Sequence, residues 1–152
     1  MLFRSTVETR RSESAQGLHV AASHDGYAAR FGLVHQRRMM LSPNGAGLSG
    51  ADRLIPAGAG KARKRRAPIP FAIRFHIHPD VRISLSQSGG SVILKLPNGD
   101  GWRFRCGGAL SLEESIYFGG GSPRRAEQLV ISGEVADQPV DCAWVFEPVG
   151  LA

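Results

Sequence analysis

The chain has 152 residues, 42% hydrophobic and 21% charged, and is long enough to bury a core as one globular domain. Its 19 Lys and Arg residues outnumber its 13 Asp and Glu residues, and the net charge of +6 favours anionic partners: nucleic acids, acidic glycans or acidic membranes. No apolar stretch approaches the roughly 20 residues of a membrane-spanning helix, and the N-terminal segment lacks the apolar core of a signal peptide.

Alternation of apolar and polar residues, broken by turn residues, predicts β-strands along most of the chain. Residues 1–17 are expected to form a truncated or frayed N-terminal strand, and residues 18–150 a sandwich domain. The first strand of that domain, at residues 19–22, leads to an Asp25-Gly26 turn, because Asp and Gly favour tight turns. Residues 27–41 are predicted to be one long or bulged strand.

The chain then turns at Pro43-Asn44-Gly45, forms a short strand over residues 48–55 and enters a basic loop at residues 57–68. The loop is rich in Gly, Ala and Pro, and its positive charge comes from Lys61, Arg63, Lys64, Arg65 and Arg66. A solvated surface loop and a dedicated anion-binding patch both fit this composition. No aromatic side chains that could stack on bases surround it, so nucleic acid is the disfavoured partner.

The clearest strand signals lie in the second half of the chain. Residues 71–78 alternate strictly and end at Pro79, which cannot donate a ladder hydrogen bond. A three-stranded meander is predicted next, over residues 81–86, 92–96 and 102–106. Its second turn contains an Asn-Gly pair, which accepts the positive φ that tight hairpins need.

Strands at residues 128–132 and 140–147 bring the predicted number to about ten, and no segment of useful length has helical periodicity. Ser122-Pro123 could begin a helical turn, but Gly119-Gly120-Gly121 before it indicates a loop. Many short strands separated by turns predict an all-β fold, an antiparallel β-sandwich in one domain. The sandwich would lack its first strands if the chain is a fragment.

The sharpest candidate for metal chemistry is His76-Ile77-His78, because residues two apart in a strand point to the same side. A third ligand would have to come from His24, His35 or Asp52. The alternative is a pair of polar residues on a sheet face, and an H-x-H pattern without a fixed third ligand favours that reading. We therefore expect neither a metal site nor a cofactor in this chain.

Turn chemistry explains His24-Asp25-Gly26-Tyr27, although its composition is that of a catalytic cluster. The Asp-Gly pair forms the turn, and the flanking His24 and Tyr27 are expected to become cross-strand neighbours. The chain has no G-x-S-x-G nucleophile elbow and no phosphate-binding loop with its lysine, so no catalytic residue is expected. Six residues remain as candidates for glycan or polar surface contact: His24, Tyr27, His35, Arg37, His76 and His78.

The two cysteines, Cys106 and Cys142, lack the C-x-x-C spacing of a zinc knuckle or a thioredoxin-type site. Each lies in a strand-like run, where the role of a small buried apolar residue is favoured. A disulfide between them would require neighbouring strands and an oxidising compartment.

Six stretches together resemble the C-terminal β-sandwich domain of the heparinase II/III-like polysaccharide lyase family. They are SHDGY at residues 23–27, RFGLVHQRR at 30–38, GADRL at 50–54, FAIRFHIHP at 71–79, NGDGW at 98–102 and EESIY at 113–117. The resemblance covers residues 18–148, and the order and spacing of the stretches make it specific.

The resemblance implies a lyase family that has an N-terminal helical toroid followed by an all-β domain. Its members cleave uronate-containing glycans by β-elimination, with Tyr and His residues as base and acid and a zinc ion held by His and Asp residues early in the β domain. Those motifs would lie upstream of Met1, so none of these roles carries over to a residue of this chain. The resemblance also implies a periplasmic or cell-envelope location.

Three hypotheses follow for the function. The first is the back portion of a heparinase II/III-like lyase, inactive as this chain, whose partners are an acidic polysaccharide or the upstream helical domain. The alternative is a non-catalytic β-sandwich module that binds acidic glycans through a basic face. A third is a small metal-binding sandwich built on His76 and His78.

Overall fold

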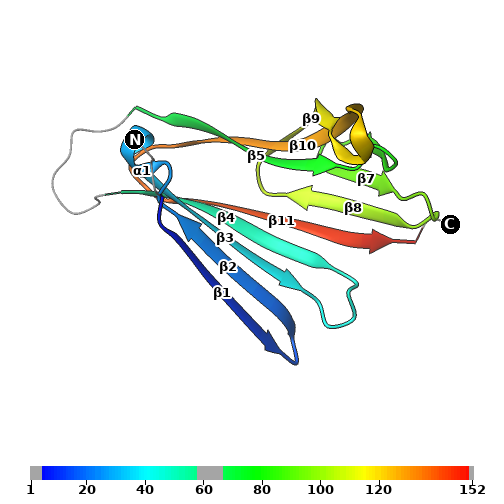
Figure 1. Cartoon of the computed structure of the whole chain (residues 1–152), viewed down its shortest axis with the longest axis horizontal. Coiled ribbons are helices and arrows are strands. Elements are labelled where there is room, and N and C mark those ends of the chain that lie inside the picture. Colours follow the sequence, from blue (N-terminus) through cyan, green and yellow to red (C-terminus); the bar gives the residue numbers. More distant parts are fainter. Residues whose placement is uncertain (1–4, 58–66, 151–152) are drawn as a thin grey trace. The chain divides into compact units, whose positions relative to one another are not determined.

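The computed structural model describes residues 5–57 and 67–150, which fold almost entirely into antiparallel β-strands (Figure 1). The basic residues expected to carry an anion-binding patch, at positions 61–66, lie outside the described residues. Within the part of the chain that the structure describes, no helix is long and apolar enough to cross a membrane.

Eleven strands and two short helical turns make up the described chain. In order they are β1 (Val7–Ser14), β2 (Gly17–His24), α1 (Ala28–Phe31), β3 (Leu33–Leu41), β4 (Leu48–Pro56), β5 (Ile69–Ile77), β6 (Arg82–Leu85), β7 (Ser91–Lys95), β8 (Gly101–Cys106), β9 (Ala109–Tyr117), the 3-10 turn η1 (Gly119–Gly121), β10 (Arg124–Val135) and β11 (Val140–Val149). An eight-stranded sheet has the order β1-β2-β3-β4-β11-β8-β7-β6, and a three-stranded sheet the order β5-β10-β9. This two-sheet, all-β architecture is the predicted β-sandwich.

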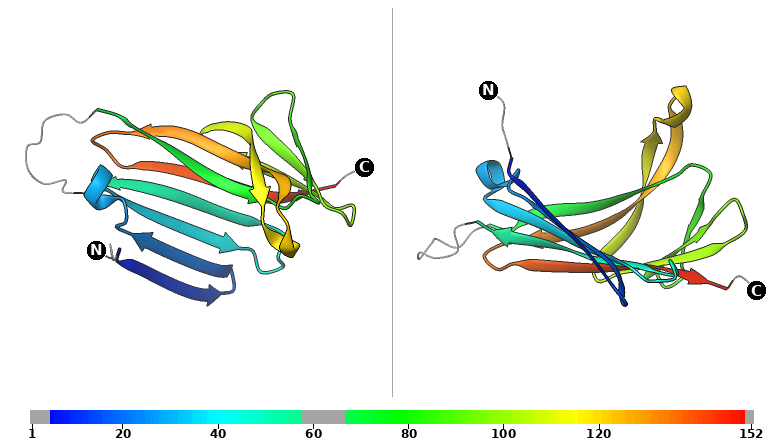
Figure 2. Two further views of the ribbon diagram at one scale, coloured as in Figure 1. Left: turned by 45° about the horizontal axis from the view of Figure 1, so that its top comes forward. Right: turned by 60° about the horizontal axis from the view of Figure 1, so that its bottom comes forward.

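The chain divides into two compact units. Unit 1 comprises the described residues of Met1–Phe71 and Glu134–Ala143, and the left view of Figure 2 shows its strands β1 to β4 side by side. Its apolar core is formed by Leu33, Leu54 and Val135, against which Ile69, Phe71 and Val140 pack. Leu33 and Leu54 project from one face of β3 and β4, so that face is the core side of the unit.

Unit 2 comprises Ala72–Gly133 and the described residues of Trp144–Ala152. The meander predicted in this segment is confirmed, because β6 pairs with β7 and β7 with β8. An aromatic cluster fills its interior: the Phe75 ring lies 5.3 Å from Phe104, 4.9 Å from Trp144 and 5.7 Å from Phe146. These tilted and edge-to-face contacts explain why the alternating apolar residues of β5 and β8 form strands here.

The prediction of one strand over residues 27–41 is wrong. The backbone N–H of Phe31 donates to the Tyr27 carbonyl at 2.9 Å and forms the one-turn helix α1. Gly32 then ends this helix with a left-handed φ of 62°, which glycine adopts without a steric penalty. Only after Gly32 does β3 begin.

Two further strands, β9 and β10, differ from the sequence prediction. Strand β9 has no counterpart in the prediction, because Glu113 and Glu114 follow each other and interrupt its alternation. Strand β10 begins at Arg124, four residues before the predicted start at residue 128. The loop expected at Gly119-Gly120-Gly121 is the 3-10 turn η1.

Candidate functional site

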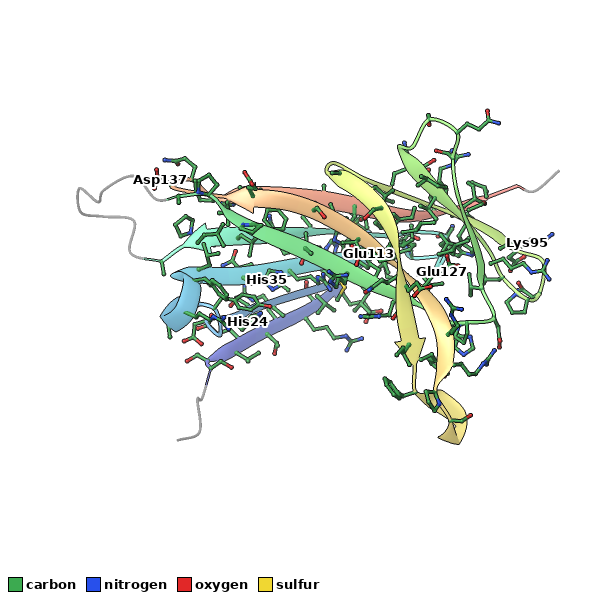
Figure 3. The ribbon with its side chains drawn as sticks, turned by 90° about the horizontal axis from the view of Figure 1, so that it is seen from above. His24, His35, Lys95, Glu113, Glu127 and Asp137 are labelled. Atoms are coloured by element: carbon green, nitrogen blue, oxygen red, sulfur yellow. The ribbon has the colours of Figure 1, made fainter. Side chains whose placement is uncertain are left out.

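Antiparallel pairing of β2, β3 and β4 places four polar residues on one face of unit 1. His24 lies opposite His35, and Arg37 lies opposite Asp52, in the registers of the two strand pairs. Residues two apart in a strand share a face, so His35 and Arg37 point to the same side, as do Asp52 and Leu54. Figure 3 shows His24 and His35 beside each other on their strands. We call these four residues the His–Asp–Arg cluster.

Asp52 is the anchor of the cluster, since its side chain is only 1% exposed. Arg37 donates to both carboxylate oxygens, from Nε to Oδ1 at 2.7 Å and from Nη2 to Oδ2 at 3.1 Å. His35 Nε2 lies 2.7 Å from the same Oδ1. Burying a carboxylate is costly unless it is paired and hydrogen-bonded, and this bidentate arginine contact together with the histidine supplies that pairing.

The protonation of the two imidazoles follows from their neighbours. The Gly26 backbone N–H donates to His24 Nδ1 at 3.2 Å, so in this arrangement His24 carries its proton on Nε2. His24 Nε2 then donates to His35 Nδ1 at 3.2 Å, and His35 Nε2–H donates to Asp52. The result is a directional chain of hydrogen bonds that runs from a backbone amide to a buried carboxylate.

The turn that begins this chain is fixed by Asp25. Its Oδ1 accepts a hydrogen bond of 2.7 Å from the Thr6 backbone N–H, and its own N–H donates to the Thr6 carbonyl at 3.3 Å. The Asp25 carbonyl also accepts from the Ala28 N–H at 2.8 Å. The turn therefore ties the segment before β1 to the start of α1 and holds the Gly26 amide in place.

Two exposed aromatic side chains flank the cluster. The Tyr27 ring lies 5.0 Å from the His24 ring and 6.3 Å from the Phe31 ring, and the Arg30 guanidinium carbon lies 5.1 Å from the Phe31 ring centre. Tyr27 is 45% exposed and Phe31 39% exposed. The expectation that His24 and Tyr27 are cross-strand neighbours is wrong, because His24 pairs with His35 while Tyr27 precedes α1.

The other two histidines lie in unit 2. His76 is in β5, and its Nδ1 lies 2.8 Å from the Ser115 hydroxyl; His78 directly follows the strand, with its ring 4.6 Å from that of Tyr117. His78 Nδ1 also accepts from the Asp80 backbone N–H at 3.3 Å. Among the residues that the structure describes, no group of three or more His, Cys, Asp or Glu side chains is arranged to hold a metal ion.

Asp80, in unit 2, has a lowered pKa. Arg124 Nη2 donates to its Oδ1 at 2.6 Å, and this hydrogen bond, helped by the positive charges of Arg124 and His78, holds the pKa of Asp80 below its usual 3.8. The shift reflects an exposed ion pair, in which each side chain is 48% exposed.

Neither Cys106 nor Cys142 forms a disulfide.

From the sequence, Asp52 was expected only as a possible metal ligand, and its contact with Arg37 was not predicted. The signal was available in the hairpin turn at Pro43-Asn44-Gly45, because a turn fixes the register and the register pairs Arg37 with Asp52. On β9, Glu113 accepts from Arg74 at 2.5 Å, and Glu114 accepts from Arg125.

The fold resembles that of solved heparan sulfate lyases. The crystal structure of heparan sulfate lyase HepC from Pedobacter heparinus matches 93% of this chain and 22% of its own, with a TM-score of 0.70 and 13% identity. A crystal structure of heparinase III matches 97% of this chain and 22% of its own, with a TM-score of 0.69 and 16% identity. At 13% and 16% identity, this similarity shows a shared fold and carries no statement about activity.

A curated relative has higher sequence identity. FtsZ-localized protein C of Caulobacter vibrioides is 35% identical over 132 residues, which cover 85% of this chain and 23% of that protein. The chain thus spans less than a quarter of the length of each of these proteins. The family model "Heparinase II/III-like, C-terminal" matches residues 2–145. The chain therefore belongs to the heparinase II/III-like, C-terminal family.

Proposed function

We propose that this chain is the C-terminal β-sandwich of a heparinase II/III-like protein that acts on acidic glycans, and that the sandwich binds glycan without cleaving it. The observation that carries the non-catalytic part is that all four ring nitrogens of His24 and His35 are engaged within unit 1. A lyase base must take the proton next to the uronate carboxylate, and neither imidazole has a free nitrogen for it.

The surface around the cluster supports glycan binding. Tyr27 and Phe31 present exposed rings on which the C–H face of a sugar can pack, and Arg30 adds a positive charge beside them. The Asp52-anchored hydrogen bonds hold His24 against Tyr27, so the aromatic surface is ordered before a ligand arrives. The net charge of +6 favours an acidic glycan over a neutral one.

Turnover and binding are measured on the same purified chain. Eliminative cleavage leaves an unsaturated uronate that absorbs in the ultraviolet, so heparan sulfate, heparin, alginate and chondroitin are incubated with the chain and followed by absorbance. We expect no rise above buffer. A rise on any of these glycans would overturn the non-catalytic part of the proposal.

Binding to the same four glycans is followed by calorimetry. We expect binding that weakens with added salt, because the contacts are between exposed charges. Tyr27→Ala should weaken it, whereas Phe118→Ala, which removes an exposed aromatic ring of unit 2, serves as the matched control and should not. No binding to any of the glycans, or equal losses in the two variants, would overturn the glycan-binding part.

A second candidate function rests on the sequence relative. We propose that the protein that carries this domain localises with FtsZ, since the relative that is 35% identical to this chain is named for that localisation. A fluorescent fusion to this chain, imaged with labelled FtsZ before and after FtsZ depletion, tests this. Dispersed fluorescence that does not change on depletion would overturn it.

A further inference from the structure

The face of β1, β2 and β3 opposite the His–Asp–Arg cluster carries a second arrangement of polar residues. Adjacent residues of a strand point to opposite faces, so Arg38 lies on the side away from Arg37. There an open depression of about 240 Å³ is lined by the strands' side chains, among them Glu8, Arg10, Ala21, Ser23, Gln36 and Arg38. This surface is separate from the one formed by Tyr27 and Phe31.

The strand registers order these residues into two rows. Arg10 lies opposite Ala21 and Ala21 opposite Arg38, so a small side chain separates two arginines. With neighbouring strands about 4.8 Å apart, the two arginine backbones are about 10 Å apart. The adjacent row contains Glu8, Ser23 and Gln36 in the same order across the strands. The alanine leaves room between the arginines, and the second row supplies hydrogen-bonding groups beside that room.

Arg10 and Arg38 differ from their neighbours in having no acidic partner among the described residues. Arg11 on the same strand lies 3.6 Å from Glu13, Arg37 is bound to Asp52, and Arg53 lies 3.8 Å from Asp141. Both Arg10 and Arg38 are exposed, so their guanidinium groups keep their hydrogen-bond donors available. Paired donors of this kind recognise carboxylate and sulfate oxygens.

We infer that this depression binds an acidic sugar residue of a glycan chain, with its anionic group between Arg10 and Arg38. The sugar hydroxyls then donate to the Glu8 carboxylate and exchange hydrogen bonds with Ser23 and Gln36. The glycan class rests on the proposed function, and the site is separate from the surface around Tyr27. Nucleic acid is disfavoured, because none of the described residues that line the depression is aromatic and could stack on a base.

The experiment compares Arg10→Gln and Arg38→Gln with Arg11→Gln in the full chain. Arg11 neighbours Arg10 on β1 and is also exposed, but its side chain points to the opposite face, so its variant loses the same charge outside the site. Binding of a heparan sulfate oligosaccharide and of an alginate oligosaccharide is titrated by calorimetry. We expect each site variant to weaken binding about tenfold, as loss of one charge-assisted hydrogen-bond contact predicts, and Arg11→Gln to weaken it about twofold or less.

The two ligands identify the anionic group. Alginate carries only carboxylates, so a loss on both ligands assigns a carboxylate, and a loss confined to heparan sulfate assigns a sulfate; either outcome supports the site. Glu8→Gln should weaken oligosaccharide binding but not the binding of inorganic sulfate, because only the sugar offers hydroxyl donors to Glu8.

Three results would overturn the inference. Equal losses in Arg10→Gln, Arg38→Gln and Arg11→Gln, with Tyr27→Ala still weakening binding, would remove this site and leave the proposed function standing. No glycan binding by the unaltered chain would remove both. Tighter binding of a single-stranded oligonucleotide, with the same dependence on Arg10 and Arg38, would replace the acidic sugar by a phosphate chain.

Discussion

The buried carboxylate of Asp52 on β4 binds His35 and Arg37 of β3, and His35 in turn contacts His24 of β2. Asp52→Ala would leave Arg37 and His35 without their common acceptor. Removing one partner of a fully buried pair costs about 3–5 kcal/mol. Arg37 is 32% exposed and recovers some hydration, so we expect a loss of about 2 kcal/mol in the free energy of unfolding.

Urea unfolding measures this loss, and Asp141→Ala is the matched control. Asp141 also faces an arginine of unit 1, but the pair is 3.8 Å apart with both side chains largely exposed, so about 0.5 kcal/mol or less is expected. Equal losses in the two variants would contradict the role assigned to Asp52.

The hydrogen-bond chain predicts a specific tautomer for each imidazole. His24 and His35 should both carry their single proton on Nε2, because a backbone donor occupies His24 Nδ1 and a carboxylate faces His35 Nε2. Nitrogen-15 NMR of the labelled chain at neutral pH distinguishes the two ring nitrogens directly. His19, outside the chain of hydrogen bonds, provides the comparison within the same spectrum. A proton on Nδ1 of either His24 or His35 would contradict the assignment.

Asp80 provides a prediction about pH. Its hydrogen bond with Arg124 holds the pKa of Asp80 below the ordinary value of 3.8 in the folded chain. A depressed pKa contributes stability above the unfolded value, and that contribution is lost as the pH falls through the folded value. Arg124→Met should therefore raise the pKa of Asp80, as followed by carboxyl NMR titration. Arg125→Met, which removes the partner of Glu114 instead, should leave the Asp80 titration unchanged.

At the scale of elements, the β1–β2 hairpin depends on a glycine that no other residue can replace easily. Gly17 has a φ of +129°, and an added Cβ would lie 2.2 Å from the Leu41 carbonyl oxygen on β3. Because that atom belongs to the backbone, β3 would have to move. We expect Gly17→Ala to lower the free energy of unfolding by about 2 kcal/mol or more.

Gly45→Ala is the comparison for this substitution. Gly45 also has a positive φ, of +68°, but a Cβ there meets nothing within 4 Å, so only the backbone cost of about 1 kcal/mol remains. Thermal unfolding of the two variants separates the cost of the clash with the Leu41 carbonyl from the cost of a positive φ in a residue other than glycine. A larger loss in Gly45→Ala would show that β2 and β3 do not approach as described.

Turn chemistry explains which elements could be predicted from the sequence. The meander of β6, β7 and β8 was predictable because Asn98-Gly99 marks a hairpin and the flanking residues alternate. Helix α1 was not, since four residues are too few to show a helical period, and only the amide of Phe31 and the φ of Gly32 reveal it. Strand β9 was not predicted, because the adjacent acids Glu113 and Glu114 interrupt its alternation of apolar and polar residues.

The same limit applies to the candidate site. His24, His35 and Arg37 were recognisable as polar residues in strands, and the structure places all three in one cluster. Their partner Asp52 required the register of β3 on β4, and the pairing of Arg10 and Arg38 across Ala21 required two registers at once. Single-strand periodicity gives the face of a residue but not its cross-strand neighbour, so these contacts could not be predicted from periodicity alone.

At the scale of the whole molecule, the fold and the family are those of a chain that spans less than a quarter of the length of its relatives. The described residues carry strands, a polar cluster and an open depression lined by two arginines. The two glycan-binding proposals concern this chain itself, and the comparison of Tyr27→Ala with Arg10→Gln separates the two surfaces of unit 1.

Strand β1 ends the larger sheet, and all eight of its residues are exposed. A sheet edge offers unpaired backbone groups to any other strand, including the β1 of a second copy. Four charged residues, Glu8, Arg10, Arg11 and Glu13, are distributed over both faces of this strand. Docking of another strand along it would bring these charges into a dehydrated interface, so Glu8 and Arg10, which the proposed sugar site uses, also oppose aggregation through this edge.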